Sequence, residues 1–556
     1  MVPPRRPYPF QTGVATLLLQ GKNVILQAPT GSGKTHAALL PFLNGLEKGR
    51  DFPRKCLYSV PMRVLAKQFV SEYQSMVTAA GRDDQLSVAI QTGEQARDPY
   101  LAQDLIFATI DQTLSSFLLA PYSLSRSRAN INAAAVMSAY LVFDEFHLYD
   151  PISTLPTTLH MLQLLKGITP FLLMTATFSE TMLDALAARL DAVVVPGSEA
   201  ERQQMRALAS QQKTRRYHIA DEPLTAEAVL STHDRRSLAI CNTVDRARRL
   251  YQDLREATKK TDTQVILLHS RFQREDRDRI EDNIRACFGK DAPHRDGSFI
   301  VVATQAIEVG VDITSTRLHT ELAPANAILQ RAGRCARYPG EEGDVFIYRY
   351  VPGDELGETV DLIESVAPYM KQEDEFESTF AVFCDRSGHT LDFVDEQQVI
   401  SAVHGKRDAE IIRQLDMDSS QHRRRLFAVM RQDEGQDARN LIREVLQQHI
   451  TIHDKPDVLL KAPFDVPAFG LHPGTLQKYV KQWLERAYEL ELDKPIWYLK
   501  RLDGDAYEFA VQNNQPVYKW EEVKTPQAAW GAPLIVVHPA LATYDPGQGF
   551  IPDVGG

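Results

Sequence analysis

Short apolar runs recur from residue 23 to residue 197, each separated from the next by a stretch suited to a helix. Such runs are typical of strands buried on both faces, as in a parallel sheet covered by helices. The first series occupies residues 23–28, 56–61, 87–93, 104–110, 140–145, 170–178 and 192–197. A second series occupies residues 237–243, 263–270, 298–304, 317–322 and 343–350. The pattern predicts two α/β domains in tandem, residues 1–220 and 221–352.

The pattern changes after residue 352, and a chain of 556 residues is too long for one core. Residues 353–450 are highly charged and mainly helical in pattern, which predicts a helical linker region. Residues 451–556 contain all four tryptophans and short runs such as "PIWYLKR" and "APLIVVHP". We predict a mixed accessory domain there, with its tryptophans packed in the core rather than stacked on bases.

The composition is that of an ordinary globular protein and excludes several other classes. No apolar run reaches the roughly 18 residues of a membrane span, and the N-terminus lacks the apolar segment of a secretory signal. The five cysteines are far apart and form no CxxC pair, which argues against a zinc or disulfide framework and favours a reducing cytoplasm. A net charge of −11 is unlike that of a protein coated in nucleic acid, but it is compatible with a basic groove on an acidic body.

The segment "APTGSGKT" follows the first apolar run and precedes a helical pattern, which is the context of a phosphate-binding loop. Backbone N–H groups and the helix N-terminus would hold phosphate oxygens. Lys34 would supply a positive charge to the β and γ phosphates, and Thr35 would help to hold Mg²⁺. The order of strand, loop and helix favours this interpretation over a simple glycine-rich turn, although Ala28 stands where the strict pattern has glycine. The predicted ATP-binding loop comprises Ala28, Pro29, Thr30, Gly31, Ser32, Gly33, Lys34 and Thr35.

The run "LVFDEFHLYD" ends a predicted buried strand in two adjacent carboxylates. By itself it is compatible with an acidic turn. Beside a phosphate-binding loop, however, a carboxylate at a neighbouring strand end is needed to hold Mg²⁺, and a base is needed to orient the attacking water. We assign Asp144 to the metal and Glu145 to the water, and expect His147 to sense the γ-phosphate.

With these two motifs the chain resembles the DExH branch of helicase superfamily two, which implies two RecA-like domains. Phe10 and Gln11 resemble the residues that read adenine, and Gly310 and Asp312 resemble those that contact nucleotide from the second domain. The segment "TAT", 175–177, resembles the motif that couples hydrolysis to strand binding. The positions that resemble backbone-gripping loops are Pro61, Arg63, Thr92, Gly93, Thr109 and Asp111 in the first domain, and Asn242, Thr243, Ser270, Arg271 and Thr304 in the second.

The segment "QRAGRCAR", 330–337, is the most specific of the motifs. Its spacing predicts that Gln330, Arg331, Arg334 and Arg337 share one helix, with side chains on a common face. Arg334 and Arg337 resemble arginine fingers that reach the γ-phosphate, and Gln330 is assigned to the same catalytic group.

These details together are most similar to the CRISPR-associated helicase of type I interference systems. The resemblance implies an ATP- and Mg²⁺-dependent, monomeric motor. It would move 3′ to 5′ on the single-stranded DNA displaced when a guide-RNA effector complex opens an R-loop. Residues 353–556 would cover the strand groove and dock on that complex.

Many members of the family carry a fused HD nuclease. The HD pairs here, His233-Asp234 and His453-Asp454, lack the companion histidines of a di-metal site. We therefore expect a separate HD nuclease subunit, or a helicase portion separated from its nuclease. A DExH RNA helicase and a DNA-repair translocase stay open as alternatives, because no motif reports on the 2′-OH. A non-enzymatic scaffold would lack catalytic groups, whereas Lys34, Glu145 and Arg334 are present.

Lys34 is expected to be essential for nucleotide binding or turnover. Lys34→Ala removes the charge that neutralises the β and γ phosphates, so nucleotide binding or turnover is expected to be lost. Equilibrium binding of labelled ATP and steady-state ATPase assays measure the two effects. Unchanged binding together with unchanged turnover would rule out the phosphate-binding loop.

Overall fold

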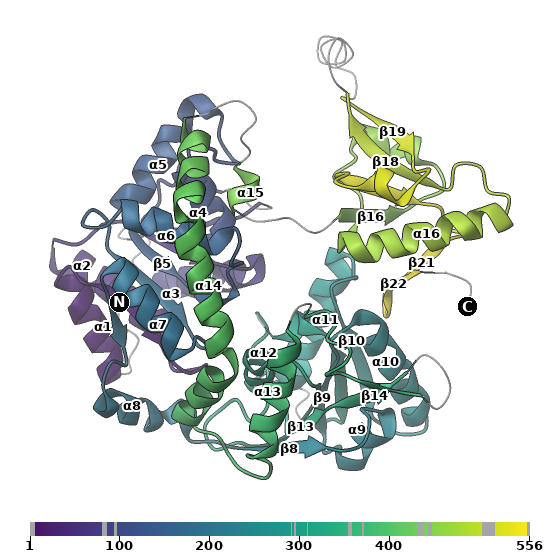
Figure 1. Cartoon of the computed structure of the whole chain (residues 1–556), viewed down its shortest axis with the longest axis horizontal. Coiled ribbons are helices and arrows are strands. Elements are labelled where there is room, and N and C mark those ends of the chain that lie inside the picture. The colour runs from purple at the N-terminus through teal and green to yellow at the C-terminus, as the bar shows by residue number, and fades with distance from the viewer. Residues whose placement is uncertain are drawn as a thin grey trace. The chain divides into compact units, whose positions relative to one another are not determined.

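The computed structural model describes residues 6–49, 51–79, 86–93, 97–290, 292–293, 296–308, 310–353, 358–369, 372–431, 438–442, 448–502 and 517–552. These residues form two compact units (Figure 1). The first unit holds the described residues of 1–223, 308–310 and 314–444, and the second holds those of 224–307, 311–313 and 445–556. The division of the chain at residues 220, 352 and 450 stays a prediction.

The first unit contains a seven-stranded parallel sheet of order β3-β4-β2-β5-β6-β1-β7. Every apolar run of the first predicted series is one of its strands. The strands are β1 (Asn23–Gln27), β2 (Cys56–Val60), β3 (Val88–Gln91), β4 (Leu105–Thr109), β5 (Tyr140–Phe143), β6 (Phe171–Thr175) and β7 (Ala192–Val195). The helices of this part are α1 (Pro9–Leu19), α2 (Lys34–Lys48), α3 (Arg63–Ala79), α4 (Ile110–Phe117), α5 (Ala129–Ser138), α6 (Thr154–Leu164), α7 (Glu180–Leu190) and α8 (Glu199–Arg206), with short 3-10 turns η1 (Arg126–Arg128), η2 (Phe146–Leu148) and η3 (Ala209–Gln211).

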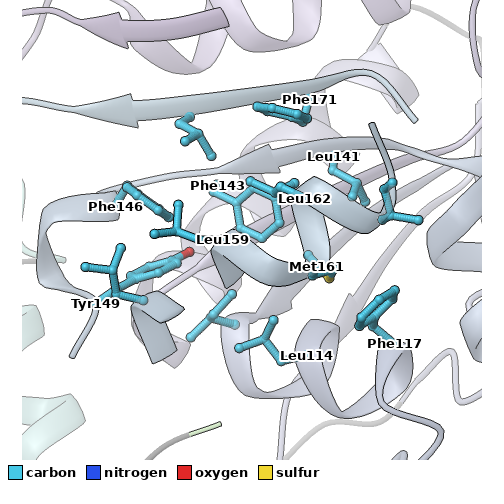
Figure 2. Packing of buried hydrophobic residues seen from close by; sticks show 14 of the residues in the cluster. Leu114, Phe117, Leu141, Phe143, Phe146, Tyr149, Leu159, Met161, Leu162 and Phe171 are labelled. Atoms are coloured by element: carbon cyan, nitrogen blue, oxygen red, sulfur yellow. The ribbon is translucent and has the colours of Figure 1, made fainter. Parts of the chain in front are cut away.

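Alternate residues of each central strand enter the two different cores of this sheet. On β5, Leu141 and Phe143 join one apolar cluster, whereas Tyr140 and Val142 join the cluster on the opposite face. Figure 2 shows the first cluster, in which Phe143 packs beside Leu159 and Leu162 of α6. Since neighbouring residues of a strand point to opposite faces, burial on both faces explains the continuous apolar runs.

The second sheet has six strands in the order β10-β11-β9-β12-β13-β8. Its described pairings are parallel. The strands are β8 (Thr214–Ala220), β9 (Arg236–Ile240), β10 (Gln264–Leu268), β11 (Phe299–Ala303), β12 (Arg317–Glu321) and β13 (Glu342–Tyr348), and the helices are α9 (Ala226–Thr232), α10 (Val244–Thr258), α11 (Arg274–Phe288), the 3-10 turn η4 (Gln305–Ile307) and α12 (Ala325–Ala332). A small antiparallel pair, β14 (Tyr350–Pro352) and β15 (Thr359–Asp361), follows.

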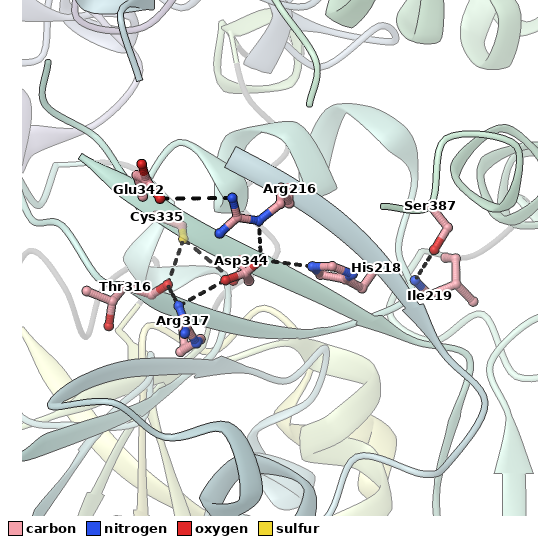
Figure 3. Close-up of polar contacts among 9 residues, drawn as sticks. All are labelled: Arg216, His218, Ile219, Thr316, Arg317, Cys335, Glu342, Asp344 and Ser387. Atoms are coloured by element: carbon pink, nitrogen blue, oxygen red, sulfur yellow. Dashed lines mark hydrogen bonds and ion pairs between the residues drawn. The ribbon is translucent and has the colours of Figure 1, made fainter. Parts of the chain in front are cut away.

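Strand β8 was not among the predicted strands, because its charged residues hid its alternation. Asp344 of β13 accepts hydrogen bonds from Nε of Arg216 at 3.0 Å and from Nε2 of His218 at 2.9 Å. Arg317 of β12 lies 2.9 Å from the other oxygen of Asp344 (Figure 3). Burial of Asp344 acts to raise its pKa, but the hydrogen bonds from Arg216 and His218 and the nearby arginine charges lower it. A buried carboxylate on β13 thus fixes β8 at the sheet edge.

A long helix links the parts of the first unit. The region predicted to be helical contains α13 (Glu373–Cys384), α14 (Phe393–Met430) and α15 (Arg439–Ile442). Helix α14 begins where the Asp392 carboxylate accepts the N–H groups of Val394 and Asp395. Leu415 and Leu426 of α14 belong to the same apolar cluster as Phe143. The helix is therefore part of the core of the first sheet.

The C-terminal part of the second unit is a mixed domain, as predicted. It is built on a sheet of order β17-β16-β20-β18-β19 covered by α16. Trp483 of α16 is fully buried in its core, as predicted, whereas Trp530 is 59% exposed, so the prediction of core packing is wrong for Trp530. The elements are β16 (Gln448–Ile452), η5 (Pro456–Lys461), β17 (Phe469–Leu471), α16 (Pro473–Glu489), β18 (Ile496–Arg501), β19 (Tyr518–Glu522), η6 (Pro526–Ala529), β20 (Leu534–Val537), β21 (Ala542–Asp545) and β22 (Gly549–Pro552). Among the described helices, none has both the length and the apolar composition that a bilayer requires.

The β21-β22 hairpin docks on the loop between β10 and α11. The N–H of Phe550 donates to the carbonyl of Arg271 at 3.0 Å, and the Tyr544 hydroxyl donates to Asp276 at 2.8 Å. Gly549 has a φ of 73°, and a Cβ there would lie 2.6 Å from Cε1 of His269 and 2.8 Å from the carbonyl oxygen of Arg271. The close approach of the hairpin therefore requires glycine at this position.

Gly549→Ala is expected to release the hairpin. Gly531 is a matched control, because its φ is 75° but a Cβ there would meet nothing within 4 Å. The left-handed backbone alone costs ~1–2 kcal/mol for a residue with a side chain, so Gly531→Ala should lower the free energy of unfolding by about that amount. Gly549→Ala should lower it further and speed proteolysis of the hairpin. Thermal unfolding and limited proteolysis measure both, and equal behaviour of the two variants would contradict the docking.

Candidate active site

The loop between β1 and α2 has the geometry of a phosphate cradle. Gly31 and Gly33 have φ values of 78° and 83°, which are unfavourable for residues with a side chain. The hydroxyl of Ser32 is buried and has no hydrogen-bond partner among the described residues. Nζ of Lys34 lies 3.4 Å from the carbonyl oxygen of Ala28 and 3.8 Å from Oε1 of Glu145. The loop thus brings a lysine and an unsatisfied hydroxyl to the start of a helix, where anions are favoured.

Gln11 of α1 is tied to this loop. Its Nε2 donates to the carbonyls of Ser32 at 3.3 Å and Gly33 at 3.1 Å, and its Oε1 accepts the N–H of Tyr8 at 2.8 Å. A Cβ on Gly33 would lie 2.7 Å from that same Nε2, so Gln11 adds a second reason for glycine there. Phe10 is buried in the neighbouring core. Contact of Phe10 and Gln11 with adenine stays a prediction.

The paired carboxylates lie at the end of β5. Oδ2 of Asp144 accepts a hydrogen bond from the Tyr58 hydroxyl at 2.8 Å, and Oδ1 accepts the N–H of Glu145 at 2.9 Å. Burial and the adjacent Glu145 charge raise the pKa of Asp144 to about 6. Burial acts to raise the pKa of Glu145 as well, but the charges of Lys34, Arg334 and Arg337 lower it. Glu145 is therefore ionised at neutral pH.

These donors fit a magnesium ion. Asp144 is a buried carboxylate whose pKa is raised by burial and by the adjacent Glu145 charge, so a cation beside it would be favoured. The Tyr58 hydroxyl hydrogen-bonds both Asp144 and the Thr35 side chain, so the two predicted ligands share a neighbour. Hydroxyl and carboxylate oxygens are the ligands that Mg²⁺ prefers. Thr35 and Asp144 would hold the ion, which would supply charge to the phosphates.

His147 contacts residues of three motifs: the paired carboxylates, the "TAT" segment and the segment 330–337. Its Nδ1 lies 3.3 Å from the hydroxyl of Thr175, in the "TAT" segment, and 3.5 Å from Oε2 of Glu145. Nε2 of Gln330 donates to Nε2 of His147 at 2.5 Å. Burial lowers the pKa of His147 to about 4, so the ring is neutral at pH 7. Because an amide nitrogen only donates, the ring proton is on Nδ1, facing Glu145 and Thr175.

The predicted single arginine helix is wrong. Helix α12 ends at Ala332, and Arg334 and Arg337 lie in the turn that follows. The N–H of Ser315 donates to the carbonyl of Arg334 at 2.9 Å, and Gly333 ends the helix. This long-range backbone pairing overrides the local helical spacing. Both arginines nevertheless lower the pKa of Glu145, as residues close to that carboxylate would.

The Arg331 side chain is buried and bonds other groups of the protein. Its side chain is fully buried, and its Nε donates to Oε1 of Glu308 at 2.8 Å. Its guanidinium also donates to the hydroxyls of Thr320 and Tyr369, each at 2.8 Å. Arg334 donates to the carbonyl of Glu308. Glu308 was missed by the sequence analysis, although an acid in the otherwise mainly apolar segment 302–313 could have been matched to the arginines of the segment 330–337.

Tyr58 was also missed, and no signal in its strand "CLYSV" could have indicated that it hydrogen-bonds Asp144.

Gly310 has a φ of 87°, which suits a residue without a side chain, and Asp312 lies two residues further along the chain. The nucleotide contacts predicted for Gly310 and Asp312 stay predictions.

The loop residues predicted for the first domain meet at one sheet edge. They follow β2, β3 and β4, which are parallel neighbours, so their carboxyl ends coincide. Pro61 and Arg63 follow β2, Thr92 and Gly93 follow β3, and Thr109 and Asp111 close β4 and open α4. A Cβ on Gly93 would lie 3.2 Å from Nη2 of Arg63, so this glycine gives the guanidinium room. A nucleic-acid role for this edge stays a prediction.

The second set of loop residues follows β9, β10 and β11, which are also parallel neighbours. These residues are Asn242, Thr243, Ser270, Arg271 and Thr304. Arg271 is 7% exposed, and its Nη1 donates to Asp245 at 2.8 Å and to the Tyr479 hydroxyl at 2.9 Å. Arg271 thus links this loop to α16, and its contact with a phosphate stays a prediction.

Neither HD pair lies in a metal cluster. His233 hydrogen-bonds the hydroxyls of Ser237 at 2.7 Å and Ser298 at 2.9 Å. Nδ1 of His453 accepts the N–H of Lys455 at 2.9 Å. No group of three or more histidine, cysteine or acidic side chains suited to a metal occurs in the part of the chain that the structure describes.

Glu145→Gln is expected to keep ATP bound while hydrolysis falls by about 10²-fold or more, because the amide cannot accept a proton from water. The exposed Glu180→Gln, on α7, is the matched control and should hydrolyse ATP normally. Nucleotide binding and steady-state turnover measure the two effects. Parental turnover in Glu145→Gln would show that another group is the base.

Two family models match the chain. Residues 8–185 match the DEAD/DEAH box helicase family, and residues 233–340 match the C-terminal part of the CRISPR-associated nuclease/helicase Cas3 family. The CRISPR-associated helicase Cas3 of Thermoproteus tenax is 30% identical over 339 residues, which cover 58% of this chain and 55% of that protein. The chain spans about half the length of such curated relatives.

Solved structures share the fold. T. fusca Cas3 superposes with a TM-score of 0.65 at 16% identity and covers 99% of this chain and 72% of its own. A chain of a CRISPR RNA-guided surveillance complex in a pre-nicking state gives a TM-score of 0.57 at 17% identity, covering 98% of this chain and 70% of its own. Together the two sheets, the family models and these relatives show that the chain is similar to the CRISPR-associated helicases of the Cas3 family.

Proposed function

We propose that this helicase is an ATP-driven motor that moves 3′ to 5′ along single-stranded DNA in type I CRISPR interference. It would unwind target DNA after a guide-RNA effector complex has opened an R-loop. The observation that carries the ATPase part is the chain of contacts from Lys34 to Glu145, from Glu145 to His147 and from His147 to Gln330. These contacts connect a phosphate-binding loop, a carboxylate base and the segment that bears two arginines.

The residues divide the chemistry of ATP hydrolysis among them. Lys34 and the backbone of the loop hold the phosphates, and Thr35 and Asp144 would hold Mg²⁺, which would supply further positive charge to them. Glu145, ionised at neutral pH, orients the attacking water and accepts its proton. Arg334 and Arg337 stabilise charge on the γ-phosphate; such arginines can contribute roughly 10³ to 10⁵ in rate.

His147 gives the site a means to couple hydrolysis to movement. A neutral ring that donates from Nδ1 and accepts at Nε2 lies between Glu145, Thr175 and Gln330. A displacement of Gln330 therefore changes the hydrogen bonding of the group beside the base. The same ring also contacts Thr175, the first residue of the "TAT" segment. A change in the hydrogen bonding of the ring would therefore also affect this segment, which leads toward the strand-end loops.

Support for single-stranded DNA and for a CRISPR effector partner comes from the names of the relatives. One is a CRISPR-associated helicase, and one neighbour is a chain of a CRISPR RNA-guided surveillance complex. The two sheet edges that carry polar loop residues suit contacts with a sugar-phosphate backbone. The proposal includes a nuclease supplied by a separate HD subunit and a monomeric motor.

ATPase turnover with single-stranded DNA, single-stranded RNA or neither, with and without Mg²⁺, tests the proposal. Stimulation by DNA is expected, and it should weaken with added salt because phosphate contacts release counterions. Stimulation by RNA alone would support the ATPase activity but contradict the DNA motor, and it would favour an RNA helicase. Glu145→Gln controls for contaminating turnover, and an unstimulated wild type would exclude a nucleic-acid motor.

A further inference from the structure

One face of α14 carries four polar residues that contact segments around the ATP site. One of them, Ser401, accepts the N–H of Glu180, the first residue of α7, at 3.2 Å. Gln397, Ser401, His404 and Asp408 are spaced by four, three and four residues, which places them on one stripe of the helix. Helix α14 lies outside both segments that match the family models. The stripe is therefore a feature of this chain that those matches do not assign.

His404 meets the N-terminus of α12. Its Nε2 accepts the N–H of Asn326 at 3.1 Å, and its Nδ1 lies 2.9 Å from Oε1 of Glu375 on α13. Helix α12 has no side-chain cap of its own at Pro324. Because Nε2 accepts, the ring proton is on Nδ1 and is donated to Glu375, whose second oxygen accepts from Arg407 at 2.9 Å. A histidine from another helix thus caps the helix that carries Gln330.

Two further residues of the stripe, Asp408 and Gln397, contact segments next to the "TAT" motif and the phosphate-binding loop. Asp408 accepts from the Ser179 hydroxyl at 2.5 Å and from its N–H at 3.3 Å, and Ser179, two residues after the "TAT" motif, caps α7. Gln397 donates to Gln27 at 2.6 Å, and Gln27 is the last residue of β1 before the phosphate-binding loop. Gln27 in turn donates to the carbonyl of Phe178 at 2.8 Å.

We infer that His404 and Asp408 are positioning residues for ATP hydrolysis. Through them α14 holds the N-terminus of α12 and the N-terminus of α7 on one rigid rod, which keeps Gln330 opposite His147. The inference rests on the proposed ATPase function, and it adds two residues far from the reacting atoms. Both buried side chains make hydrogen bonds that a purely apolar packing surface would not need.

The test compares His404→Leu with His404→Gln and Gln414→Leu. Leucine keeps bulk but removes the acceptor, whereas glutamine returns an acceptor near the position of Nε2. Gln414 is an exposed residue of the same helix that bonds only Asp418 among the contacts described for it. His404→Leu is expected to lower kcat about fivefold, equivalent to the ~1 kcal/mol of a lost helix cap, with KM for ATP nearly unchanged. His404→Gln should restore most of kcat, and Gln414→Leu should resemble the wild type.

Hydrogen exchange at the amides of α12, measured on the full chain, separates this inference from the proposed function. Faster exchange in His404→Leu with restoration by His404→Gln is expected whether or not nucleic acid stimulates turnover. An inactive wild type would overturn the ATPase function, while unchanged exchange or unchanged kcat in His404→Leu would overturn the positioning role. Asp408→Asn, which is nearly isosteric, serves if His404→Leu does not fold. It should lower kcat about threefold by weakening a charged hydrogen bond, and an unchanged kcat would again overturn the role.

Discussion

The hydrogen bond between Gln330 and His147 is the contact on which the arrangement of the site depends. It joins a residue of α12 to a ring that also faces Glu145 and Thr175. The bond requires a neutral ring, since a doubly protonated imidazole has no acceptor. Burial meets that requirement by lowering the pKa of His147 to about 4. The buried ring of His147 thus keeps one defined tautomer, with its proton on Nδ1. A histidine in water would exchange between its two tautomers.

The same balance between burial and charge orders the rest of the site. A buried carboxylate is costly unless positive groups or hydrogen bonds compensate for it. Glu145 has Lys34 and two arginines nearby, so its pKa is lowered, whereas burial and the adjacent Glu145 charge raise the pKa of Asp144 despite the hydrogen bonds that it accepts. Two adjacent carboxyl groups with different environments can take different roles. One suits a metal ligand, and the other suits a base.

Much of the fold and the central motifs could be predicted from sequence because their signals are local. A continuous apolar run reports burial on both faces, and "APTGSGKT" between strand and helix reports its own loop. The failures came from contacts distant in sequence. Strand β8 was missed because Arg216 and His218 bond Asp344 more than one hundred residues away. The end of α12 was missed because Ser315 pairs with the carbonyl of Arg334. No local pattern distinguishes His404, which caps a helix 78 residues earlier, from a solvent-facing histidine.

If the strand-end loops bind nucleic acid as proposed, their composition favours a particular mode of binding for an acidic protein. Thr92, Thr109 and Thr304 are nearly buried, and Arg271 is already paired with Asp245. Apart from the exposed Arg63, such loops could offer mainly backbone N–H groups at sheet edges, and these groups bind phosphates without reading bases. A motor built on them would follow any strand it is given. The choice of target would then have to come from whatever loads the motor, which agrees with a proposed partner whose guide RNA reads sequence by base pairing.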